Sequence, residues 1–267
     1  MSITQGDELT SMRATAPLVH CITNYVAMNM AANVLLAAGA SPAMLHAEEE
    51  VAEFASLANA LTINIGTLSA PWLAAMKVAA ASANASAKPW VLDPVAHHAT
   101  AFRRSAISEL LDLRPTIIRG NASEIITLSG GHSASRGVDS LDAVAAAEDA
   151  AVRVAKQHGS IVAVTGAADF VTDGERSVRL TGGSPLMPQI TALGCSLTCM
   201  IGAFAGDRPA RLLGATVTAL ACFKLAGELA GQQAAGPGSF AWRFVDALAS
   251  IEQRDLNAWM GHGVVTL

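Results

Sequence analysis

The sequence predicts an α/β protein in which a mostly parallel sheet is flanked by helices, organised as a single domain over residues 1–267. Helix and strand signals alternate along the chain, as they do when helices connect parallel strands. The 267 residues suffice for one large core, and no repeat, low-complexity tail or long linker divides them. Several polar residues also follow directly after predicted strands, where proteins of this class bind ligands.

In the first half of the chain, helical patterns alternate with short apolar segments typical of buried strands. The predicted helices cover residues 24–38, 48–60, 71–85 and 102–113. Gly39 is placed to end the first helix and Ser69 to cap the third, while Pro115 stops the fourth. The predicted strands cover residues 43–45, 61–65, 90–92 and 116–118.

The second half begins with a short helix at residues 123–128, which Asn121 is placed to cap, and a loop at 129–132. The longest helical pattern, at 140–158, leads to a buried strand at 161–164. Strands at 170–172 and 177–180 flank Asp173-Gly174, a dipeptide typical of hairpin turns. The helices predicted after the hairpin cover residues 196–204, 210–231 and 240–249.

The low charge of the chain limits its partners. It carries 17 basic and 22 acidic residues, and no basic cluster indicates binding to nucleic acid or to an anionic membrane. Charged residues are 15% of the chain, against about 25% in an average soluble protein. Residues 14–47 and 54–76 contain no charged residue, yet polar residues and prolines interrupt them too often for a membrane span. An interface between copies of the chain and a merely alanine-rich composition both explain these stretches.

The cysteine pattern and the first residues predict a cytoplasmic protein. The four cysteines form no CxxC pair and no disulfide framework, so free thiols in a reducing compartment are expected. Asp7 and Glu8 precede any apolar run, which is unlike a secretory signal.

A glycine-containing turn before an apolar helix is a candidate anion site. Residues 191–195 (TALGC) lead into the helix predicted at 196–204, with Gly194 expected as the turn residue. Amide groups at a helix N-terminus lack partners within the helix and attract phosphate. No charged residue occurs between Arg179 and Asp207, so no carboxylate close in sequence opposes an anion. An ordinary loop before a core helix explains the same pattern, which alone leaves both interpretations open.

Polar residues that follow the predicted strands together suit phosphoryl transfer. They are Asp93, Arg119, Asn121, Glu124 and Thr165. Taken singly, an aspartate before a proline is usually a turn former and an asparagine before a helix is usually a cap. Together they provide two carboxylates for a hard cation, an arginine for phosphate and a hydroxyl at a strand end.

Motifs of several other enzyme classes are missing from the sequence. It contains no GxxxxGK[ST] phosphate loop, no GxGxxG after a strand and no HExxH zinc motif. The adjacent pair His97-His98 has a spacing that suits no common zinc site. Residues 194–198 lack the last glycine of a hydrolase nucleophile elbow.

Short segments spread over the chain form a specific combination. They are HCITNYV (20–26), MN (28–29), GASPAM (39–44), NIGT (64–67), LDPV (92–95), RGNASEI (119–125), GVDS (137–140), VTG (164–166) and TALGC (191–195). In this order they resemble the hydroxyethylthiazole kinase family over about residues 17–206, while the last sixty residues match only as helices of suitable length.

The resemblance implies a ribokinase-like fold, with helices on both faces of a largely parallel sheet. It implies an enzyme that uses ATP and Mg²⁺ to phosphorylate the primary alcohol of 4-methyl-5-(2-hydroxyethyl)thiazole, a step of thiamine salvage. It also implies a homotrimer with active sites between subunits, which favours an interface as the explanation of the charge-free stretches.

Residue roles follow from the resemblance at matching positions. The residues expected beside the thiazole are Asn24, Val26, Met44, Ala192 and Gly194. The residues expected to bind ATP are Arg119, Asn121 and Thr165. Those expected to hold Mg²⁺, directly or through water, are Asp93 and Glu124. Cys195 stands where most of the ribokinase-like superfamily has an aspartate as base.

Two features of the glycine turn affect the chemistry expected there. Many family members have Thr-Gly-x-Gly-Cys, whereas this chain has Ala192 at the first glycine position. If that position needs a positive φ, alanine strains it by about 1 kcal/mol; if not, alanine makes the loop more rigid. A helix-start thiol at Cys195 is expected to have a lowered pKa and still to be a poor base, with electrostatic stabilisation supplying most of the rate.

Three alternative functions use parts of the same sequence. A ribokinase-like kinase for a hydroxymethylpyrimidine is disfavoured because Cys195 replaces the usual aspartate. An ADP-dependent dehydratase acting on hydrated nicotinamide cofactors shares the fold and is a weaker alternative. A non-catalytic nucleotide-binding protein is disfavoured because Asp93, Arg119 and Glu124 are all retained.

Overall fold

The structure is a computed structural model that describes residues 7–131 and 141–267. His132, at the end of the predicted loop, and the GVDS segment at 137–140 lie outside these ranges. Within the described chain, one sheet of nine strands has the order β2-β1-β3-β4-β5-β6-β7-β8-β9. Neighbouring strands from β2 to β6 are parallel, and those from β6 to β9 are antiparallel. The predicted α/β class with a largely parallel sheet is therefore confirmed.

The strands agree with the prediction in the centre of the sheet and differ at its edges. They are β1 (Leu18–Ile22), β2 (Ser41–Ala43), β3 (Ala60–Asn64), β4 (Trp90–Asp93), β5 (Ile117–Asn121), β6 (Ile161–Thr165), β7 (Ala168–Thr172), β8 (Ser177–Thr181) and β9 (Val264–Thr266). The strand predicted at 43–45 begins earlier because β2 pairs with β1 in the register that sets Ser41 opposite Leu18. β1 and β9 were not predicted: β1 contains the polar His20, and three-residue β9 depends on pairing with β8.

The helices begin and end at most of the predicted signals. They are α1 (Glu8–Thr15), α2 (Met28–Ala38), α3 (Val51–Leu57), α4 (Ala70–Ala85), α5 (Ala101–Asp112), α6 (Ala122–Leu128), α7 (Leu141–His158), α8 (Leu193–Asp207), α9 (Leu212–Gln233), α10 (Pro237–Ser250) and α11 (Gln253–Gly263), with short 3-10 turns η1 (His97–Ala99) and η2 (Met187–Gln189). Gly39 ends α2 with a φ of 99°, and Ser69 caps α4 by accepting from the amide of Trp72. α3 is shorter than predicted because Ala58 is extended and Ala60 already belongs to β3. α1 and α11 were not predicted.

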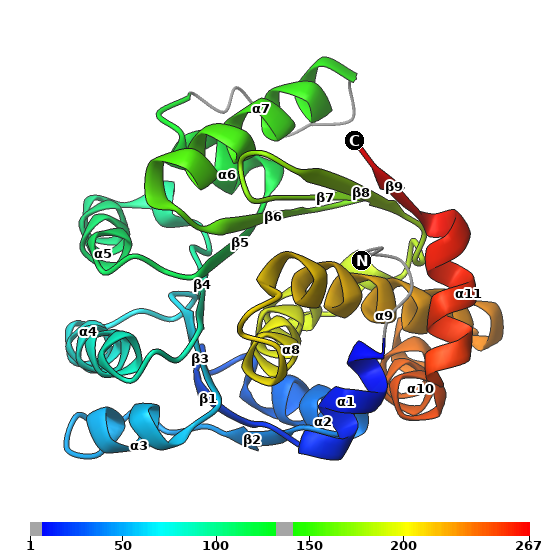
Figure 1. The fold of residues 1–267 in the computed structure, drawn as a ribbon, viewed down its shortest axis with the longest axis horizontal. Helices are drawn as coiled ribbons and strands as arrows, with labels where there is room; N and C mark the ends of the chain where they lie inside the picture. The colour runs from blue at the N-terminus through cyan, green and yellow to red at the C-terminus, as the bar shows by residue number, and fades with distance from the viewer. Residues whose placement is uncertain (1–6, 132–140) are drawn as a thin grey trace.

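Helices cover both faces of the sheet and form an apolar core on each (Figure 1). α3 to α7 lie on one face, where Met76, Trp90 and Leu110 are fully buried. α1, α2 and α8 to α11 lie on the other face, where Leu35 and Phe204 are fully buried. Of the described helices, α9 alone is long and apolar enough to cross a membrane, but 78% of its most apolar window is buried inside the protein, as in a core helix.

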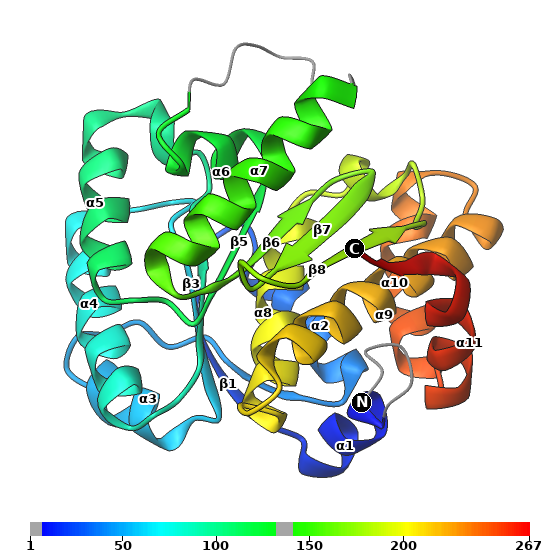
Figure 2. The ribbon, with the colours of Figure 1, turned by 45° about the horizontal axis from the view of Figure 1, so that its top comes forward.

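The β7–β8 hairpin extends the sheet beyond its parallel part (Figure 2). Thr172 pairs with Ser177, so the predicted hairpin is confirmed, with residues 173–176 as its connection. Oδ1 of Asp173 accepts hydrogen bonds from the amides of Glu175 and Arg176 at 3.0 and 2.7 Å, which stabilises this connection. The hairpin matters for the site because β8 leads directly into the loop that begins at Gly182.

Candidate active site

A chain of hydrogen-bonded polar side chains joins the ends of three parallel strands. Asn24 follows β1, Asn64 ends β3, and Asp93 ends β4. Nδ2 of Asn24 donates to Oδ1 of Asn64, and Nδ2 of Asn64 donates to Oδ2 of Asp93, both at 2.8 Å. Thr198 of α8 donates its hydroxyl to the same oxygen of Asp93 at 2.7 Å. These four buried residues are called the strand-end network below.

Asp93 is fully buried and yet has one free oxygen. Burial raises the pKa of its carboxyl to about 6, against the opposing charge of Arg119, and the charge of Glu124 raises it further. Oδ1 of Asp93 has no hydrogen-bond partner among the described residues. A buried acceptor without a donor is costly, so this oxygen fits a hard cation or a water molecule as its partner.

Arg119 of β5 and Thr165 at the end of β6 form a second polar pair. Nη2 of Arg119 donates to Oγ1 of Thr165 at 2.5 Å, while Nη1 lies 3.5 Å from Oδ2 of Asp93. The arginine side chain is 13% exposed, and its Nε has no partner within the described part of the chain. Because a guanidinium has five donor hydrogens, Arg119 keeps the capacity to bind a phosphate.

Asn121 and Glu124 are bound to each other at the start of α6. Oδ1 of Asn121 accepts from the amide of Glu124 at 2.9 Å, and Oε2 of Glu124 accepts from the amide of Asn121 at 2.8 Å. This capping box confirms the predicted cap and joins it to the carboxylate. Oε1 of Glu124 accepts from the amide of Ala96 at 3.0 Å, so each carboxylate oxygen already has one backbone donor.

Ala192, and not Gly194, is the turn residue before α8. Ala192 has a φ of 66°, whereas Gly194 lies inside the first turn of the helix. Alanine in the left-handed region costs about 1–2 kcal/mol, so the strain considered for this position is present. Gly194 lets Arg119 approach closely, since a Cβ there would lie 3.0 Å from Nη2 of Arg119 and would press against the guanidinium. The sequence shows that a glycine is present at position 194. It does not show whether that glycine forms the turn or leaves room for Arg119.

The first amides of α8 remain available to an anion. The amide of Ser196 donates to the carbonyl of Ala192 at 2.9 Å, which closes the first turn. The preceding amides, those of Leu193, Gly194 and Cys195, have no acceptor within the helix, and the helix dipole adds positive potential there. Together with the adjacent guanidinium of Arg119, they form a site suited to phosphate.

Cys195 is a neutral thiol in this environment. Burial raises the pKa of the thiol to about 11, and the charge of Asp93 raises it further. Hydrogen bonds from Asn24, whose Nδ2 lies 3.4 Å from Sγ, and from Asn64 act in the opposite direction, as does Arg119. The predicted lowering of this pKa is wrong, because burial and a neighbouring carboxylate, both absent from the sequence pattern, outweigh the helix terminus.

Two residues expected beside the thiazole take no part in the hydrogen bonds of the strand-end network in the single chain. Val26 is 59% exposed, and its neighbour Tyr25 is 65% exposed. Met44 is half-buried and packs against the apolar core on the α2 and α8 face. The structure therefore gathers Asn24, unlike Val26 and Met44, with the other predicted residues.

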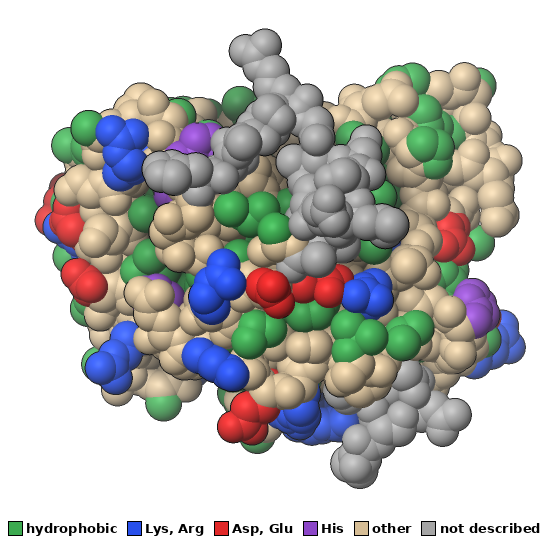
Figure 3. Space-filling view, turned by 90° about the horizontal axis from the view of Figure 1, so that it is seen from above, with side chains coloured by type: hydrophobic (Ala, Val, Ile, Leu, Met, Phe, Trp, Pro, Cys, Tyr) green, Lys and Arg blue, Asp and Glu red, His purple; other side chains and the backbone are tan. Residues whose placement is uncertain are grey.

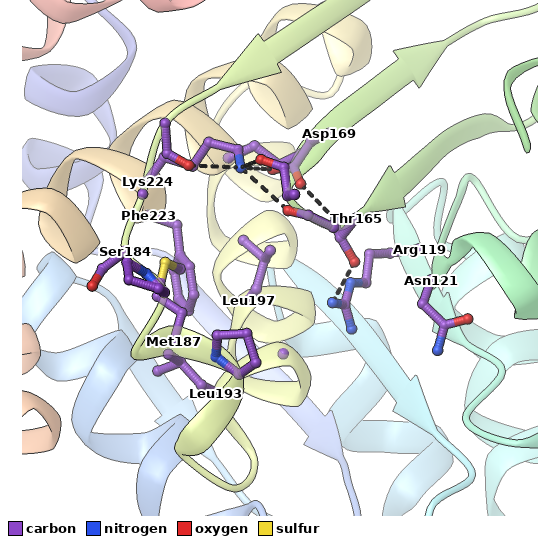
Figure 4. Close-up of a pocket in the computed structure, with 18 residues that line it drawn as sticks. Arg119, Asn121, Thr165, Asp169, Ser184, Met187, Leu193, Leu197, Phe223 and Lys224 are labelled. Atoms are coloured by element: carbon purple, nitrogen blue, oxygen red, sulfur yellow. Dashed lines mark hydrogen bonds and ion pairs between the residues drawn. The ribbon is translucent and has the colours of Figure 1, made fainter. Parts of the chain in front are cut away.

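A cavity of about 790 Å³ opens beside Arg119 and Thr165 (Figure 4). Its lining includes the predicted residues Arg119, Asn121, Thr165 and Gly194. Opposite them, Met187, Leu193, Leu197 and Phe223 provide an apolar wall. A polar end beside an apolar wall is the usual composition of a site for a ligand with a charged part and a flat apolar part.

Lys224 of α9 forms a buried cluster at the other end of this cavity. Its Nζ lies 3.3 Å from Oδ2 of Asp169 and donates to the carbonyls of Ala167 and Gly182 at 3.3 Å each. One turn later, Oε1 of Glu228 accepts from the amide of Gly183 at 3.0 Å. The Lys224 cluster, meaning Lys224, Asp169 and Glu228, thus holds the loops that follow β6 and β8.

Five of these functional-site residues had no predicted role, namely Asn64, Asp169, Thr198, Lys224 and Glu228. Asn64 is the next-to-last residue of the strand predicted at 61–65, whereas Asp93 directly follows the strand predicted at 90–92. Lys224 and Glu228 are the charged residues of the otherwise apolar helix at 212–233, and they are spaced by one turn. A lone charged pair in an apolar helix is a usable signal of a buried interaction.

The described residues contain no cluster of three or more His, Cys, Asp or Glu side chains that could hold a metal by themselves. Asp93 with its free oxygen is the carboxylate best suited to a cation that is otherwise coordinated by water or by a substrate phosphate.

Solved structures of small-molecule kinases share this architecture. Pyridoxal kinase from Staphylococcus aureus superimposes with a TM-score of 0.58 at 14% identity, covering 79% of this chain and 87% of that one. A ribokinase-like superfamily protein from Enterococcus faecalis gives 0.62 at 15% identity, covering 88% of each chain. These likenesses concern the fold alone. The chain therefore has the ribokinase-like fold, with Asp93 and Thr165 at the carboxyl ends of β4 and β6.

More similar proteins identify the family. The family model "Hydroxyethylthiazole kinase family" matches residues 9–254. Hydroxyethylthiazole kinase of Rhizobium rhizogenes is 66% identical over 255 residues, covering 96% of this chain and 95% of that protein. The structure of the hydroxyethylthiazole kinase protein from Pyrococcus horikoshii has a TM-score of 0.87 at 37% identity, covering 98% of both chains. The chain belongs to the hydroxyethylthiazole kinase family and is a kinase.

Proposed function

We propose that this protein transfers the γ-phosphoryl group of ATP to the primary hydroxyl of 4-methyl-5-(2-hydroxyethyl)thiazole, a step of thiamine salvage. The observation that carries the proposal is the convergence of Arg119, Thr165 and the first amides of α8 at one end of the cavity. Phosphoryl transfer depends mainly on positioning and on charge stabilisation, which this arrangement provides.

ATP is proposed to occupy the cavity with its phosphates toward Arg119, Thr165 and Asn121. Oδ1 of Asn121 is bound to the Glu124 amide, which leaves the Asn121 side-chain NH₂ as a donor. The apolar wall that includes Met187 and Phe223 suits the flat base of a nucleotide. The first amides of α8 would then face the charge that develops during transfer.

Mg²⁺ is proposed to bind beside Asp93 and Glu124. The free Oδ1 of Asp93 fits a direct contact, and Glu124, whose oxygens each have a backbone donor, fits a contact through water. A bound Mg²⁺ would neutralise phosphate charge. The chain itself fixes the Asp93 carboxylate through Asn64 and Thr198.

The thiazole alcohol is proposed to bind near Asn24, Ala192 and Gly194, with Val26 and Met44 contacting the ring. Val26, Tyr25 and Leu36 are 59%, 65% and 62% exposed in the single chain, which is unusual for large apolar side chains. A homotrimer in which a second copy covers residues 14–47 would bury them and complete the site. Sedimentation at micromolar concentration should give a trimer, and a monomer would contradict this assembly.

Cys195 is proposed to lie beside the attacking hydroxyl as a neutral thiol. With a pKa of about 11, only about one thiol in 10⁴ is ionised at pH 7, so proton removal by the thiolate contributes little. In a loose transition state the nucleophile loses its proton late, so a weak base at position 195 suffices.

The proposed partners are small molecules and copies of the chain, in the cytoplasm. On the face seen in Figure 3, acidic and basic side chains are interspersed. Arg179 forms an ion pair with Glu148 at 2.8 Å. Such a mixed surface gives no support to nucleic-acid binding.

The decisive experiment is an ATP-consumption assay with a panel of thiazole and pyrimidine alcohols. Turnover of 4-methyl-5-(2-hydroxyethyl)thiazole with Mg²⁺ present, and formation of its phosphate by mass spectrometry, are expected. Turnover of a hydroxymethylpyrimidine alone would reject the proposed acceptor while leaving the kinase class intact.

A further inference from the structure

Arg103, near the start of α5, donates hydrogen bonds to two loops at once. Its Nη1 lies 2.7 Å from the carbonyl oxygen of Ile65 and 2.9 Å from that of Val95. Its Nη2 donates to the carbonyl of Gly66. Ile65 and Gly66 directly follow Asn64 of β3, and Val95 lies two residues beyond Asp93 of β4. Arg103 therefore links the two chain segments that leave the strand-end network.

The guanidinium of Arg103 is satisfied by backbone carbonyls. Among the residues that the structure describes, none forms an ion pair with it. A planar guanidinium directs its donors at fixed angles, so it fixes the separation of the groups that it binds. A lysine ammonium at this position is a single point with rotatable donors and could hold this arrangement only in part.

Both loops carry groups of the site. The amide of Gly66 donates to Oδ1 of Asn64 at 2.9 Å, and a Cβ on Gly66 would lie 2.7 Å from Nδ2 of Asn24. On the other loop, Ala96 has a φ of 49° and donates its amide to Glu124. A shift of either loop would therefore displace Asn24 or remove a donor from Glu124.

We propose that Arg103 is a positioning residue that fixes the loops after β3 and β4 relative to each other. In this way it sets the place of Asn24 beside the phosphoryl acceptor and the place of the Glu124 carboxylate. Its kinetic consequence rests on the proposed function, because Arg103 itself touches neither ATP nor the thiazole alcohol. The cavity residues on β6, α8 and α9 receive no hydrogen bond from it.

Steady-state kinetics of Arg103→Met, Arg103→Lys and Arg104→Met test this role. Arg104 is the matched control, because it is the next residue, is exposed, and donates to the carbonyl of His98 in η1, beyond the residues that Arg103 binds. In Arg103→Met we expect kcat to fall about 10- to 100-fold and KM for the thiazole alcohol to rise severalfold, while KM for ATP stays within twofold. Arg103→Lys should fall between Arg103→Met and the wild type, and Arg104→Met should match the wild type.

Hydrogen exchange measured by mass spectrometry provides a readout that needs no turnover. Peptides covering residues 64–67 and 94–97 should exchange at least tenfold faster in Arg103→Met than in Arg104→Met, because their amides bind Asn64, Pro94 and Glu124. Peptides covering residues 166–169 and 182–184 should be unchanged. If Arg103→Met does not fold, the same comparison is made with Arg103→Lys.

The outcomes separate this inference from the proposed function. An inactive wild type rejects the proposed acceptor, and faster exchange confined to the two loops would still support Arg103 as their link. An active wild type whose Arg103 variants lose kcat only in proportion to the unfolded fraction, with both KM values unchanged, would overturn the inference. Unchanged exchange in both loops would overturn it as well.

Discussion

The strand-end network and the Lys224 cluster lie on opposite sides of Arg119 and Thr165 and are stabilised differently. The strand-end network consists of uncharged donors around one carboxylate, placed where β1, β3 and β4 end. The Lys224 cluster consists of a buried ion pair between α9 and β7, and its lysine also binds the backbone of two loops. One is fixed by the parallel sheet, and the other depends on a helix that docks from the last part of the chain.

This difference has a physical consequence for what each side tolerates. A hydrogen bond contributes about 0.5–1.5 kcal/mol between neutral groups and about 1.5–3 kcal/mol to a charged group, so a conservative change of one neutral donor in the strand-end network should leave the protein folded. A buried ion pair is costly to break, because the remaining charge has no partner. Changes on the Lys224 side should therefore affect stability first, and changes around Arg119 and the strand-end network should affect catalysis first.

The largest effect is expected from Lys224→Met. It leaves the buried carboxylate of Asp169 without its cation, which costs about 3–5 kcal/mol of unfolding free energy. Urea denaturation checks the change, and KM for ATP should rise in the folded fraction, because the loops at Ala167 and Gly182 lose a donor. The double variant Asp169→Asn/Lys224→Met is the matched control and should regain more than half of the lost stability. A double variant less stable than Lys224→Met would show that the pair is not coupled.

Arg119→Ala and Glu124→Gln should reduce turnover while the protein stays folded. Loss of a charge-assisted contact made mainly in the transition state costs about 2–4 kcal/mol, or about 10²–10³ in rate. Glutamine has one acceptor oxygen, so Glu124→Gln can keep the capping-box bond from the Asn121 amide but loses the bond from the Ala96 amide together with the charge. Circular dichroism and steady-state assays measure both effects, with the exposed Arg153→Ala as control. Near-normal turnover in either folded variant would remove that residue from the site.

The pH dependence of stability should report the buried carboxyl of Asp93. Its folded pKa of about 6 lies above its ordinary value of 3.8, so the folded state holds this proton more tightly than the unfolded chain. The resulting stabilisation is fully present below about pH 4 and is lost as the pH rises through about 6. Relative to Asp93→Asn, the wild type without Mg²⁺ should lose up to about 3 kcal/mol over this window, measured by urea denaturation. Parallel curves for the two proteins would place the pKa of Asp93 near its ordinary value.

Variants of Cys195 should have a smaller effect than those of Arg119. Cys195→Ala keeps the amide and the turn. We therefore expect turnover to fall by less than about 100-fold, which is below the range of about 10²–10⁴ for loss of a general base. Cys195→Asp should retain activity, because aspartate is anionic at neutral pH and favourable in the first turn of a helix. The pH profile of kcat for the wild type should show no limb from this thiol between pH 7 and 9, given its pKa of about 11. Full activity of the alanine variant with an inactive aspartate variant would leave only the amides with a role.

The smallest effect is expected from Ala192→Gly, which relieves a φ of 66°. The free energy of unfolding should rise by up to about 1 kcal/mol, since glycine adopts this conformation without strain but is more flexible when unfolded. Turnover should change less than about threefold because the amide is retained. Ala87→Gly is the control, because Ala87 has a φ of 52° and lies far along the chain from α8. This variant should show a similar gain in stability when thermal denaturation is measured. A destabilised Ala192→Gly would show that rigidity matters more here than strain.

The sequence predicted well those parts of the site that depend on a single strand or helix terminus. Asp93, Arg119 and Thr165 follow apolar runs whose ends are visible in the pattern, and Asn121 with Glu124 has the spacing of a capping box. The family resemblance then assigned roles to them. The predictions that were wrong or missing concern features that depend on contacts between segments distant in sequence. The pKa of Cys195 follows from Asp93 and from burial, and the need for Gly194 follows from Arg119.

The sequence by itself determined the α/β class, most element boundaries, the family and the polar residues at the strand ends, because these follow from periodicity, caps and local order along the chain. Only the tertiary structure decided that Arg103 joins the loops after Asn64 and Asp93, and that Lys224 and Glu228 hold the loops after β6 and β8. Those contacts join residues between 8 and 57 positions apart in sequence. Such interactions leave no periodic trace, because their partners are backbone groups that every residue carries.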